Sequence, residues 1–213
     1  PEIIRNLPYY IPVKEKINNK KINKNRLTIG ATGTIDWRKS PDIFISIAAA
    51  VFYKRPEINI EFRWKGAYDG LELERLRYDV NKAGLDKNVF FINSSDEMDE
   101  FYSSLDILLL TSREDPYPLV VLEAASWGIP TICFEKAGGA TEFVEYSNGG
   151  VNIPYLDINS ASELILSYHD FPELFKARGF NAQTYISATH QNKQYVNDYF
   201  TSSLELILRN VQD

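Results

Sequence analysis

Two acidic residues lie on either side of a predicted helix start in the stretch 111–124. Asp115 precedes Pro118, which fits the first turn of a helix, and Glu123 follows four apolar residues inside that helix. The first amides of a helix lack partners within it and carry a partial positive charge, so this end is suited to binding phosphate. A carboxylate among apolar residues needs hydrogen-bond donors, which sugar hydroxyls supply. The spacing therefore predicts a site for a phosphate group and a sugar.

The elements that position these residues alternate along the chain. Short apolar runs predict buried strands, and the longer amphipathic stretches between them predict helices. The predicted strands are 27–31, 59–64, 89–92, 107–110, 131–134 and 150–153, and the predicted helices are 41–53, 71–83, 96–104, 119–127 and 139–146. Helical sequence follows to the end. This order predicts an α/β fold, a Rossmann-like doubly wound parallel sheet of about six strands, with ligands at the carboxyl ends of the strands.

The 213-residue chain has the composition of a soluble globular protein, with 44% hydrophobic and 24% charged residues. It contains no apolar run near the roughly 20 residues that span a bilayer, and its first residues lack a signal-peptide pattern. Cys133 is the single cysteine, and His169 and His190 are the only histidines. This inventory excludes an intrachain disulfide framework and argues against metal catalysis. We expect a cytoplasmic protein with a buried thiol and both histidines at its surface.

The two ends of the chain differ from its middle. Residues 1–26 carry seven Lys and Arg against two Glu in a polar stretch without a clear period, which we interpret as an interdomain linker or edge. Residues 27–190 form the predicted ligand-binding domain. Residues 191–213 predict a helix that packs on this domain or reaches a missing one. The overall net charge of −6 argues against a nucleic-acid partner, although the basic run could contact anionic lipid.

Several motifs together resemble one family. The phrase DPYPLVVLEA at 115–124, with its two acidic residues, resembles the signature of retaining glycosyltransferases of family 4, also called group 1. The stretch GTIDWRKS at 33–40 is similar to the family's Gly-Arg-Leu-x-x-x-Lys-Gly loop, and FRWKG at 62–66 to its second strand. GGATE at 138–142 is similar to its Gly-Gly-x-x-Glu turn. The likeness runs from about Ile3 to the last helix.

Members of this family have two Rossmann-like domains in the GT-B architecture. This chain resembles the C-terminal domain, one half of a GT-B fold, which holds most of the nucleotide sugar. The resemblance implies a nucleoside-diphosphate sugar as donor substrate, no metal or other cofactor, and a missing N-terminal domain with most of the acceptor site. It also suggests a lipid-linked acceptor at the cytoplasmic face of the membrane.

The resemblance also assigns roles to residues. Lys39 would pair with the donor diphosphate, Glu123 would bind the ribose hydroxyls, and Asp115 would lie beside the donor sugar. A placed cation stabilises the negative charge that a leaving diphosphate gains. Lys39 and Asp115 are the candidate catalytic residues. The other candidate substrate-binding residues are Gly33, Thr34, Arg38, Glu114, Tyr117, Pro118, Leu119 and Val120.

The sequence departs from the family pattern at two positions. Thr34 stands where the family has an arginine, and either Arg38 or Arg113 could replace that cation. Asp115 stands where the family usually has Glu, and the adjacent Glu114 could substitute for it. Neither the nucleotide base nor the donor sugar can be read from these residues.

We expect a retaining glycosyltransferase that acts in surface polysaccharide or glycolipid synthesis and is inactive as this isolated domain, because the reaction takes place between two domains. The alternative is a non-catalytic nucleotide-binding module of the same fold. An oxidoreductase ranks last, because the stretch 30–33 lacks the third glycine of a dinucleotide-binding loop.

Overall fold

The computed structural model describes residues 9–12, 26–68, 70–94 and 97–212. The strands are β1 (Leu27–Thr32), β2 (Ile60–Ala67), β3 (Val89–Asn93), β4 (Ile107–Leu110), β5 (Thr131–Phe134) and β6 (Gly150–Ile153). The helices between them are α1 (Pro41–Lys54), α2 (Leu71–Lys82), α3 (Met98–Ser104), α4 (Leu119–Ser126) and α5 (Ala140–Ser147), followed by α6 (Ile158–Asp170), α7 (Pro172–Ala188) and α8 (Lys193–Gln212). Each predicted strand and helix is therefore present, with ends that differ by at most a few residues.

Within the described residues, the six strands form one parallel sheet in the order β3-β2-β1-β4-β5-β6. The first strand, β1, lies in the middle of the sheet, and β2 and β3 follow it toward one edge. The chain then crosses back to β4, which pairs with β1 on its other side. This crossover is the point at which a doubly wound sheet opens a ligand-binding crevice. The predicted Rossmann-like doubly wound fold is confirmed.

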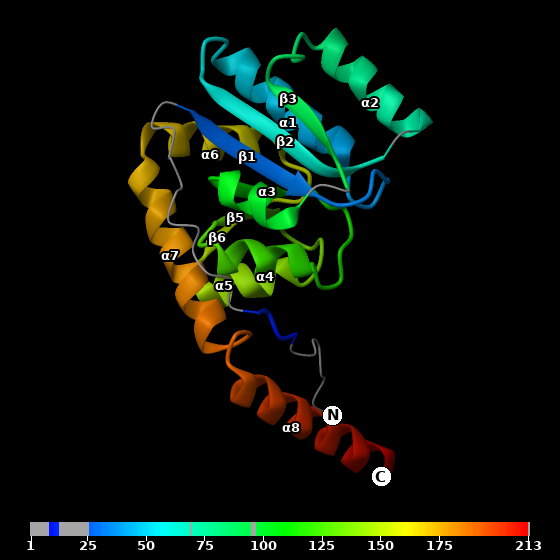
Figure 1. Cartoon of the computed structure of the whole chain (residues 1–213), viewed down its shortest axis with the longest axis vertical. Coiled ribbons are helices and arrows are strands. Elements are labelled where there is room, and N and C mark those ends of the chain that lie inside the picture. The colour runs from blue at the N-terminus through cyan, green and yellow to red at the C-terminus, as the bar shows by residue number, and fades with distance from the viewer. Residues whose placement is uncertain (1–8, 13–25, 69, 95–96, 213) are drawn as a thin grey trace.

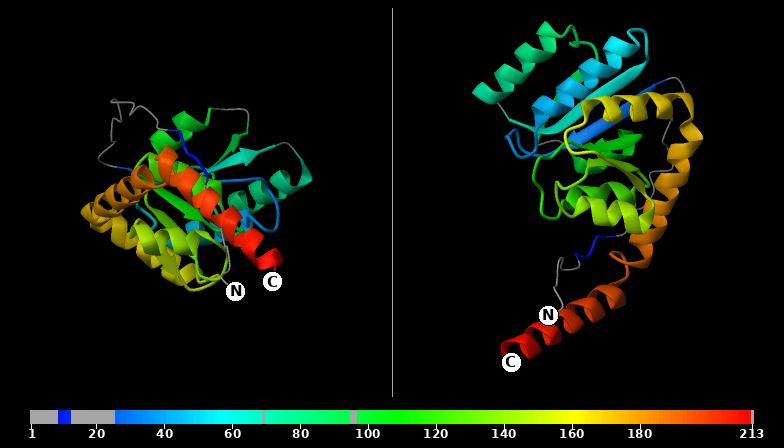
Figure 2. Two further views of the ribbon diagram at one scale, coloured as in Figure 1. Left: turned by 90° about the horizontal axis from the view of Figure 1, so that it is seen from below. Right: turned by 180° about the vertical axis from the view of Figure 1, so that it is seen from behind.

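Helices cover both faces of the sheet (Figures 1 and 2). On one face α1, α2 and α6 pack against Phe62, Trp64 and their neighbours, and Phe44 meets both rings edge-on at 5.5 Å. On the other face α3, α4 and α5, with part of α7, pack against Leu108 and Cys133. Because strand side chains alternate between faces, each central strand contributes to both cores.

The sequence, with Ser40 directly before Pro41, predicts that the Ser40 side chain caps α1, and this prediction is wrong. Ser40 does hold the N-cap position before Pro41, but its φ of 59° is left-handed and its hydroxyl makes no bond to a helix amide. The hydroxyl donates instead to Trp37 O at 3.0 Å. Ser40 therefore stabilises the loop before the helix rather than the helix end.

The predicted linker 1–26 lies mostly outside the described residues, but 9–12 form a contact with the end of α7. Ile11 is buried, and its N–H donates to His190 O at 2.9 Å. The ring of His190, Nδ1, lies 2.8 Å from Tyr9 O. The prediction that His190 lies at the surface is therefore wrong, because 9–12 cover it, and burial lowers the pKa of its ring.

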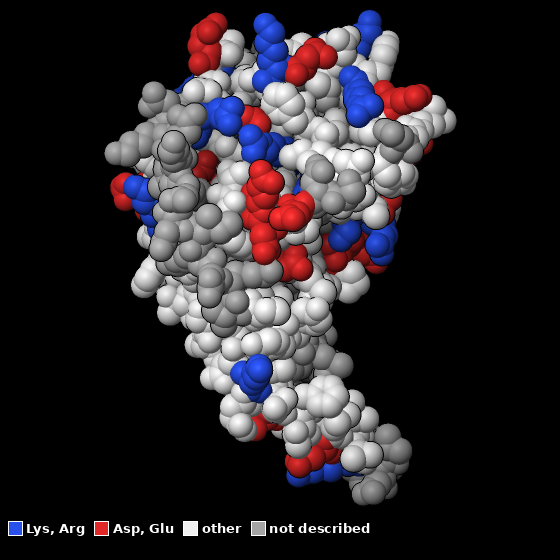
Figure 3. Space-filling model, in the orientation of Figure 1, with Lys and Arg blue, Asp and Glu red and all other residues white. Residues whose placement is uncertain are grey.

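The predicted C-terminal helix is present as α8, which continues from the end of α7 away from the sheet (Figures 1 and 2). Its apolar side chains Tyr199, Leu204, Ile207 and Leu208 are exposed. Across the described part of the chain, every helix is too short or too polar to traverse a lipid bilayer. Among the described residues on the face shown in Figure 3, basic and acidic side chains are interspersed over the sheet half of the molecule.

The loops after β4 and β5 touch through their backbones at Gly138. Asp115 and Gly138 form a parallel bridge, with Asp115 N donating to Ala137 O at 2.7 Å and Gly139 N donating to Pro116 O at 3.0 Å. Gly138 has a φ of +142°, and a Cβ there would lie 1.7 Å from Asp115 O. Only glycine fits this contact.

We therefore expect Gly138→Ala to lower the free energy of unfolding by about 2–4 kcal/mol, through backbone strain and overlap with Asp115 O. Gly84→Ala is the matched control, since Gly84 also has a positive φ of +71° but open space at its Cβ. We expect that control to lose only about 1 kcal/mol. Urea unfolding of both variants measures the difference, and equal losses would contradict the close contact.

Candidate active site

Two loops at the carboxyl ends of adjacent strands build the site. The loop 33–40 follows β1, and the loop 111–118 follows β4 and leads into α4. Because β1 and β4 pair in parallel, both loops leave the same edge of the sheet. This arrangement brings together residues that are far apart in the sequence.

The start of the loop 33–40 is held by the end of β2. Gly33 N donates to Lys65 O at 2.9 Å, and the indole N–H of Trp64 donates to Gly33 O at 3.0 Å. Gly66 has a φ of +108°, and a Cβ there would lie 2.4 Å from Gly33 O. The glycine that the family pattern places after the second strand is therefore required by this close approach of two backbones.

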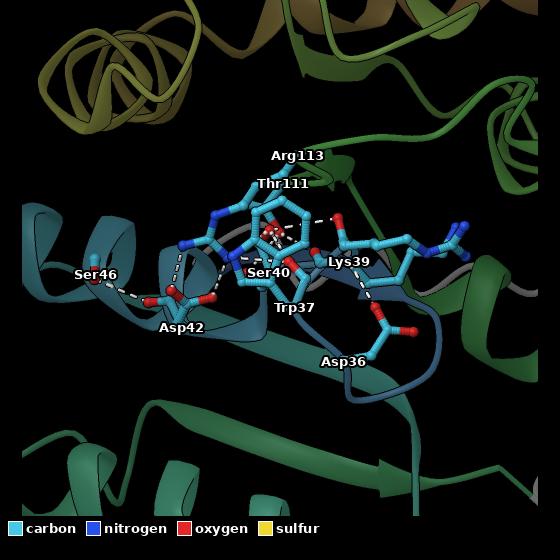
Figure 4. Close-up of polar contacts among 9 residues, drawn as sticks. Asp36, Trp37, Lys39, Ser40, Asp42, Ser46, Thr111 and Arg113 are labelled. Atoms are coloured by element: carbon cyan, nitrogen blue, oxygen red, sulfur yellow. Dashed lines mark hydrogen bonds and ion pairs between the residues drawn. The ribbon is translucent and has the colours of Figure 1, made fainter.

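Asp36 closes the middle of the same loop. Its carboxylate accepts hydrogen bonds from Thr34 Oγ1 at 2.6 Å and from the N–H of Lys39 at 2.9 Å, the second of which is drawn in Figure 4. Partial burial raises the pKa of Asp36, but these hydrogen bonds outweigh it, and the pKa is lowered. Thr34, in the family's arginine position, is thus bound within the loop.

The two candidate catalytic residues form an ion pair. Lys39 Nζ lies 2.5 Å from Asp115 Oδ2, and the side chains are 18% and 11% exposed. Ser112 Oγ lies 3.4 Å from the same Asp115 oxygen. An ammonium has three donors, so Lys39 can bind a further acceptor without leaving this place. An Asp before a helix start also predicts a cap of α4 by Asp115, but Pro118 holds that position, and no side chain caps the helix.

The first turn of α4 offers fewer backbone donors than the sequence suggested. Val121 N donates to Pro118 O at 3.1 Å. Among the described residues, no backbone acceptor outside the helix binds the amides of Leu119 or Val120. These two amides are left to carry the positive end of the helix dipole.

Glu123 lies one turn further into α4 and is held by a residue that the sequence analysis missed. The hydroxyl of Tyr102, on α3, donates to Glu123 Oε2 at 2.6 Å. Tyr102 is almost fully buried, and burial together with the nearby Glu123 charge raises the pKa of its hydroxyl. Tyr102 belongs to no motif, and the only feature of the sequence that could have pointed to its role is its position in the predicted helix 96–104.

Of the remaining candidate side chains, some are exposed and one contacts another side chain of the chain. Arg38 and Glu114 are exposed, so the structure places Asp115, and not Glu114, beside Lys39. The hydroxyl of Tyr117 lies 3.3 Å from the ring of His190, and burial raises the pKa of that hydroxyl to about 12.

From the sequence alone, Arg113 is expected to pair with the adjacent Glu114 or with nothing, and this expectation is wrong. Its guanidinium binds both carboxylate oxygens of Asp42 at the start of α1, at 3.0 and 2.7 Å (Figure 4). Asp42 is 71 residues earlier in the sequence, so no local spacing predicts the contact. The hydrogen bond to Asp42 raises the pKa of Arg113.

Comparison with curated proteins gives relatives in bacterial polysaccharide synthesis. The chain is 28% identical to the exopolysaccharide phosphotransferase SCO2592 of Streptomyces coelicolor, over 64% of this chain and 14% of that protein. It is 27% identical to the lipopolysaccharide core biosynthesis mannosyltransferase LpsB of Rhizobium meliloti, over 54% of this chain and 33% of that protein. The matched part is thus no more than about a third of either relative.

Comparison with solved structures gives the fold. The crystal structure of TarM from S. aureus, in complex with fondaparinux, alpha-GlcNAc-glycerol and UDP, matches 91% of this chain and 38% of that protein. The TM-score is 0.77 and the identity 18%. The likeness shows that the chain shares the Rossmann-like α/β fold of a GT-B structure.

The family itself is given by a sequence model. The model described as glycosyl transferases group 1 matches residues 12–184. This stretch holds both loops of the site and the helix α4 that carries Glu123. The match covers most of the chain, and the protein is therefore a member of the group 1 glycosyltransferase family.

Proposed function

We propose that this chain is the donor-binding domain of a retaining glycosyltransferase that transfers a hexosyl-type sugar from a nucleoside-diphosphate sugar to an acceptor hydroxyl. The observation that carries the proposal is the Lys39–Asp115 ion pair, whose carboxylate lies in the loop that leads into the first amides of α4. Among the proteins that this chain resembles, TarM has been crystallised with UDP, and LpsB is a lipopolysaccharide core biosynthesis mannosyltransferase. The first supports a nucleotide-sugar donor, and the second supports a role in surface polysaccharide or glycolipid synthesis.

The proposed chemistry rests on charge. When the bond between the sugar and the diphosphate breaks, the electron pair leaves with the diphosphate, and its negative charge rises. Lys39 and the amides of Leu119 and Val120 are fixed positive groups that would stabilise this charge as it develops. We assign no protein nucleophile. The main contribution of the domain is to position the donor and to stabilise its leaving group.

Glu123 would bind the ribose. Since Tyr102 already donates to Oε2, we assign the second oxygen, Oε1, to a ribose hydroxyl. The buried tyrosine keeps the carboxylate in one orientation, so that less order is lost when the ligand binds. Tyr102 is thus a positioning residue for Glu123 in this proposal.

The acceptor site would belong to a second domain, since this chain matches only 38% of TarM. The exposed apolar side chains of α8 would pack on that domain. We expect no transfer by the isolated chain, because the reaction needs both sides of the cleft. The proposal also includes a cytoplasmic location, with a lipid-linked acceptor at the membrane face.

A non-catalytic nucleotide-binding module remains the second candidate, and one observation favours it. Thr34 leaves the loop without the family's arginine, and the side chain of Arg113 is held by Asp42. A longer protein that contains both domains separates the two functions. Turnover of a nucleotide sugar favours the enzyme, whereas nucleotide binding without turnover favours the module.

The first test is a calorimetric titration of the chain with UDP, GDP, ADP and NAD. We expect one nucleoside diphosphate to bind, and Lys39→Ala and Glu123→Ala each to weaken it by about 1–3 kcal/mol through loss of a charged hydrogen bond. Lys54→Ala is the matched control, because Lys54 binds Asn159 and Ser162 on α6. Binding of NAD alone, or equal affinity in Lys39→Ala and Lys54→Ala, would overturn the proposal.

The second test concerns metal. Because the proposal gives the diphosphate to Lys39 and backbone amides, its affinity should change by less than about twofold when EDTA replaces Mg²⁺. The same titration in both buffers measures this. A loss of binding in EDTA that Mg²⁺ restores would show that the donor site depends on a cation.

A further inference from the structure

We infer that Arg113 and Asp42 are positioning residues: they hold the loop 33–40 in the shape that presents Lys39 to Asp115, and Arg113 does not itself bind the donor. The inference rests on the proposed function for what Lys39 does, but its structural part can be tested without a ligand.

The second half of the loop, 37–40, is bound through its backbone carbonyls by two residues that follow β4. Arg113 donates from its side chain to Trp37 O at 3.0 Å and from its N–H to Arg38 O at 2.7 Å. Thr111 Oγ1 lies 3.1 Å from both Lys39 O and Ser40 O. Trp37 O and Arg38 O thus accept from Arg113, and Lys39 O and Ser40 O share the single hydroxyl proton of Thr111. The carbonyl groups on either side of the Lys39 side chain are fixed by these contacts.

The guanidinium of Arg113 is held in place by Asp42. The two groups form a bidentate pair at 3.0 and 2.7 Å, the geometry that makes arginine–carboxylate contacts strong and directional. The ring of Trp37 lies over the guanidinium at 5.4 Å (Figure 4). A guanidinium with these partners has its charge balanced by a carboxylate. It is therefore poorly placed to replace the cation that Thr34 lacks.

Ser40 explains why the loop needs this support. Its φ of 59° and ψ of 56° are left-handed, a backbone conformation that residues other than glycine usually avoid. Ser40 Oγ accepts from the Arg113 guanidinium at 3.0 Å and donates to Trp37 O. The family pattern has glycine at this position, and here the Arg113 contact stabilises a serine in the same turn.

The ligand-free test is limited proteolysis with trypsin, which cleaves after Arg38 and Lys39. We expect Arg113→Gln and Asp42→Asn to speed this cleavage about 5- to 30-fold, because the loop opens more often. Arg113→Lys should not restore protection, since an ammonium cannot form the bidentate pair. Asp42→Asn keeps the size of a partly exposed side chain, so it tests the inference even if Arg113→Gln fails to fold.

Arg55→Gln is the matched control. Arg55 forms a second bidentate pair, with Asp170 at 2.7 and 2.6 Å, that joins the far end of α1 to the end of α6. Its loss should leave cleavage after Arg38 and Lys39 unchanged. Unchanged cleavage in both Arg113→Gln and Asp42→Asn, or the same increase in Arg55→Gln, would overturn the inference.

A double-mutant cycle tests the route through Lys39, with the nucleoside diphosphate that binds the unaltered chain as the probe. We expect Arg113→Gln to weaken binding about 5- to 30-fold in the unaltered chain and to have no further effect in Lys39→Ala. Additive losses would show that Arg113 contacts the donor itself and would overturn the inference. If no nucleoside diphosphate binds the unaltered chain, the proposed function fails, and the trypsin result still decides the role of the Arg113–Asp42 pair.

Discussion

The buried ion pair between Lys39 and Asp115 is stable only if the loops that carry the two residues hold them in a fixed geometry. Both side chains are less than a fifth exposed, and their charged atoms are 2.5 Å apart. Taking two charges out of water is unfavourable, and their attraction offsets this only when the geometry is well held. Because the two residues are 76 positions apart, that geometry depends on two separate loops keeping their backbones fixed. The contacts of these loops can be understood as the means of doing so.

Backbone contact, more than side-chain packing, fixes these loops. Gly66 lets the start of the loop 33–40 lie against the end of β2, and Gly138 lets the loop after β4 lie against the loop after β5. Asp115 is thus held by a bridge to Gly138, and Lys39 by hydrogen bonds to the carbonyls around it. These two glycines, which lie in motifs of the family resemblance, do not take part in the ion pair itself. They allow the close backbone contacts that hold its two loops, because a Cβ would not fit at either position.

The sequence predicted elements well where burial alone decides them. Strands β4, β5 and β6 begin and end at the predicted residues. β4 and β5 lie inside the sheet and are buried along their whole length, so that no polar side blurs their apolar pattern. The sequence motifs also pointed to Lys39 and Asp115, which the structure brings together in an ion pair, and their roles in binding stay a prediction. Contacts across the fold were not predictable: the partner of Arg113 is on α1, and His190 is covered by 9–12. Such contacts depend on how loops pack, and neither periodicity nor spacing contains that information.

The ion pair also affects how a donor substrate would bind. Under the proposed function, a diphosphate oxygen bound to another donor of the Lys39 ammonium shares its positive charge and weakens the bond to Asp115. Asp115 is 8% exposed. A carboxylate this deeply buried needs another hydrogen-bond donor when it loses one. Ser112 Oγ, at 3.4 Å, supplies one weak contact, whereas a hydroxyl of the donor sugar would supply a full hydrogen bond. A ligand with both groups would then satisfy Lys39 with its phosphate and Asp115 with its sugar, whereas a ligand with the phosphate alone would leave Asp115 under-bonded.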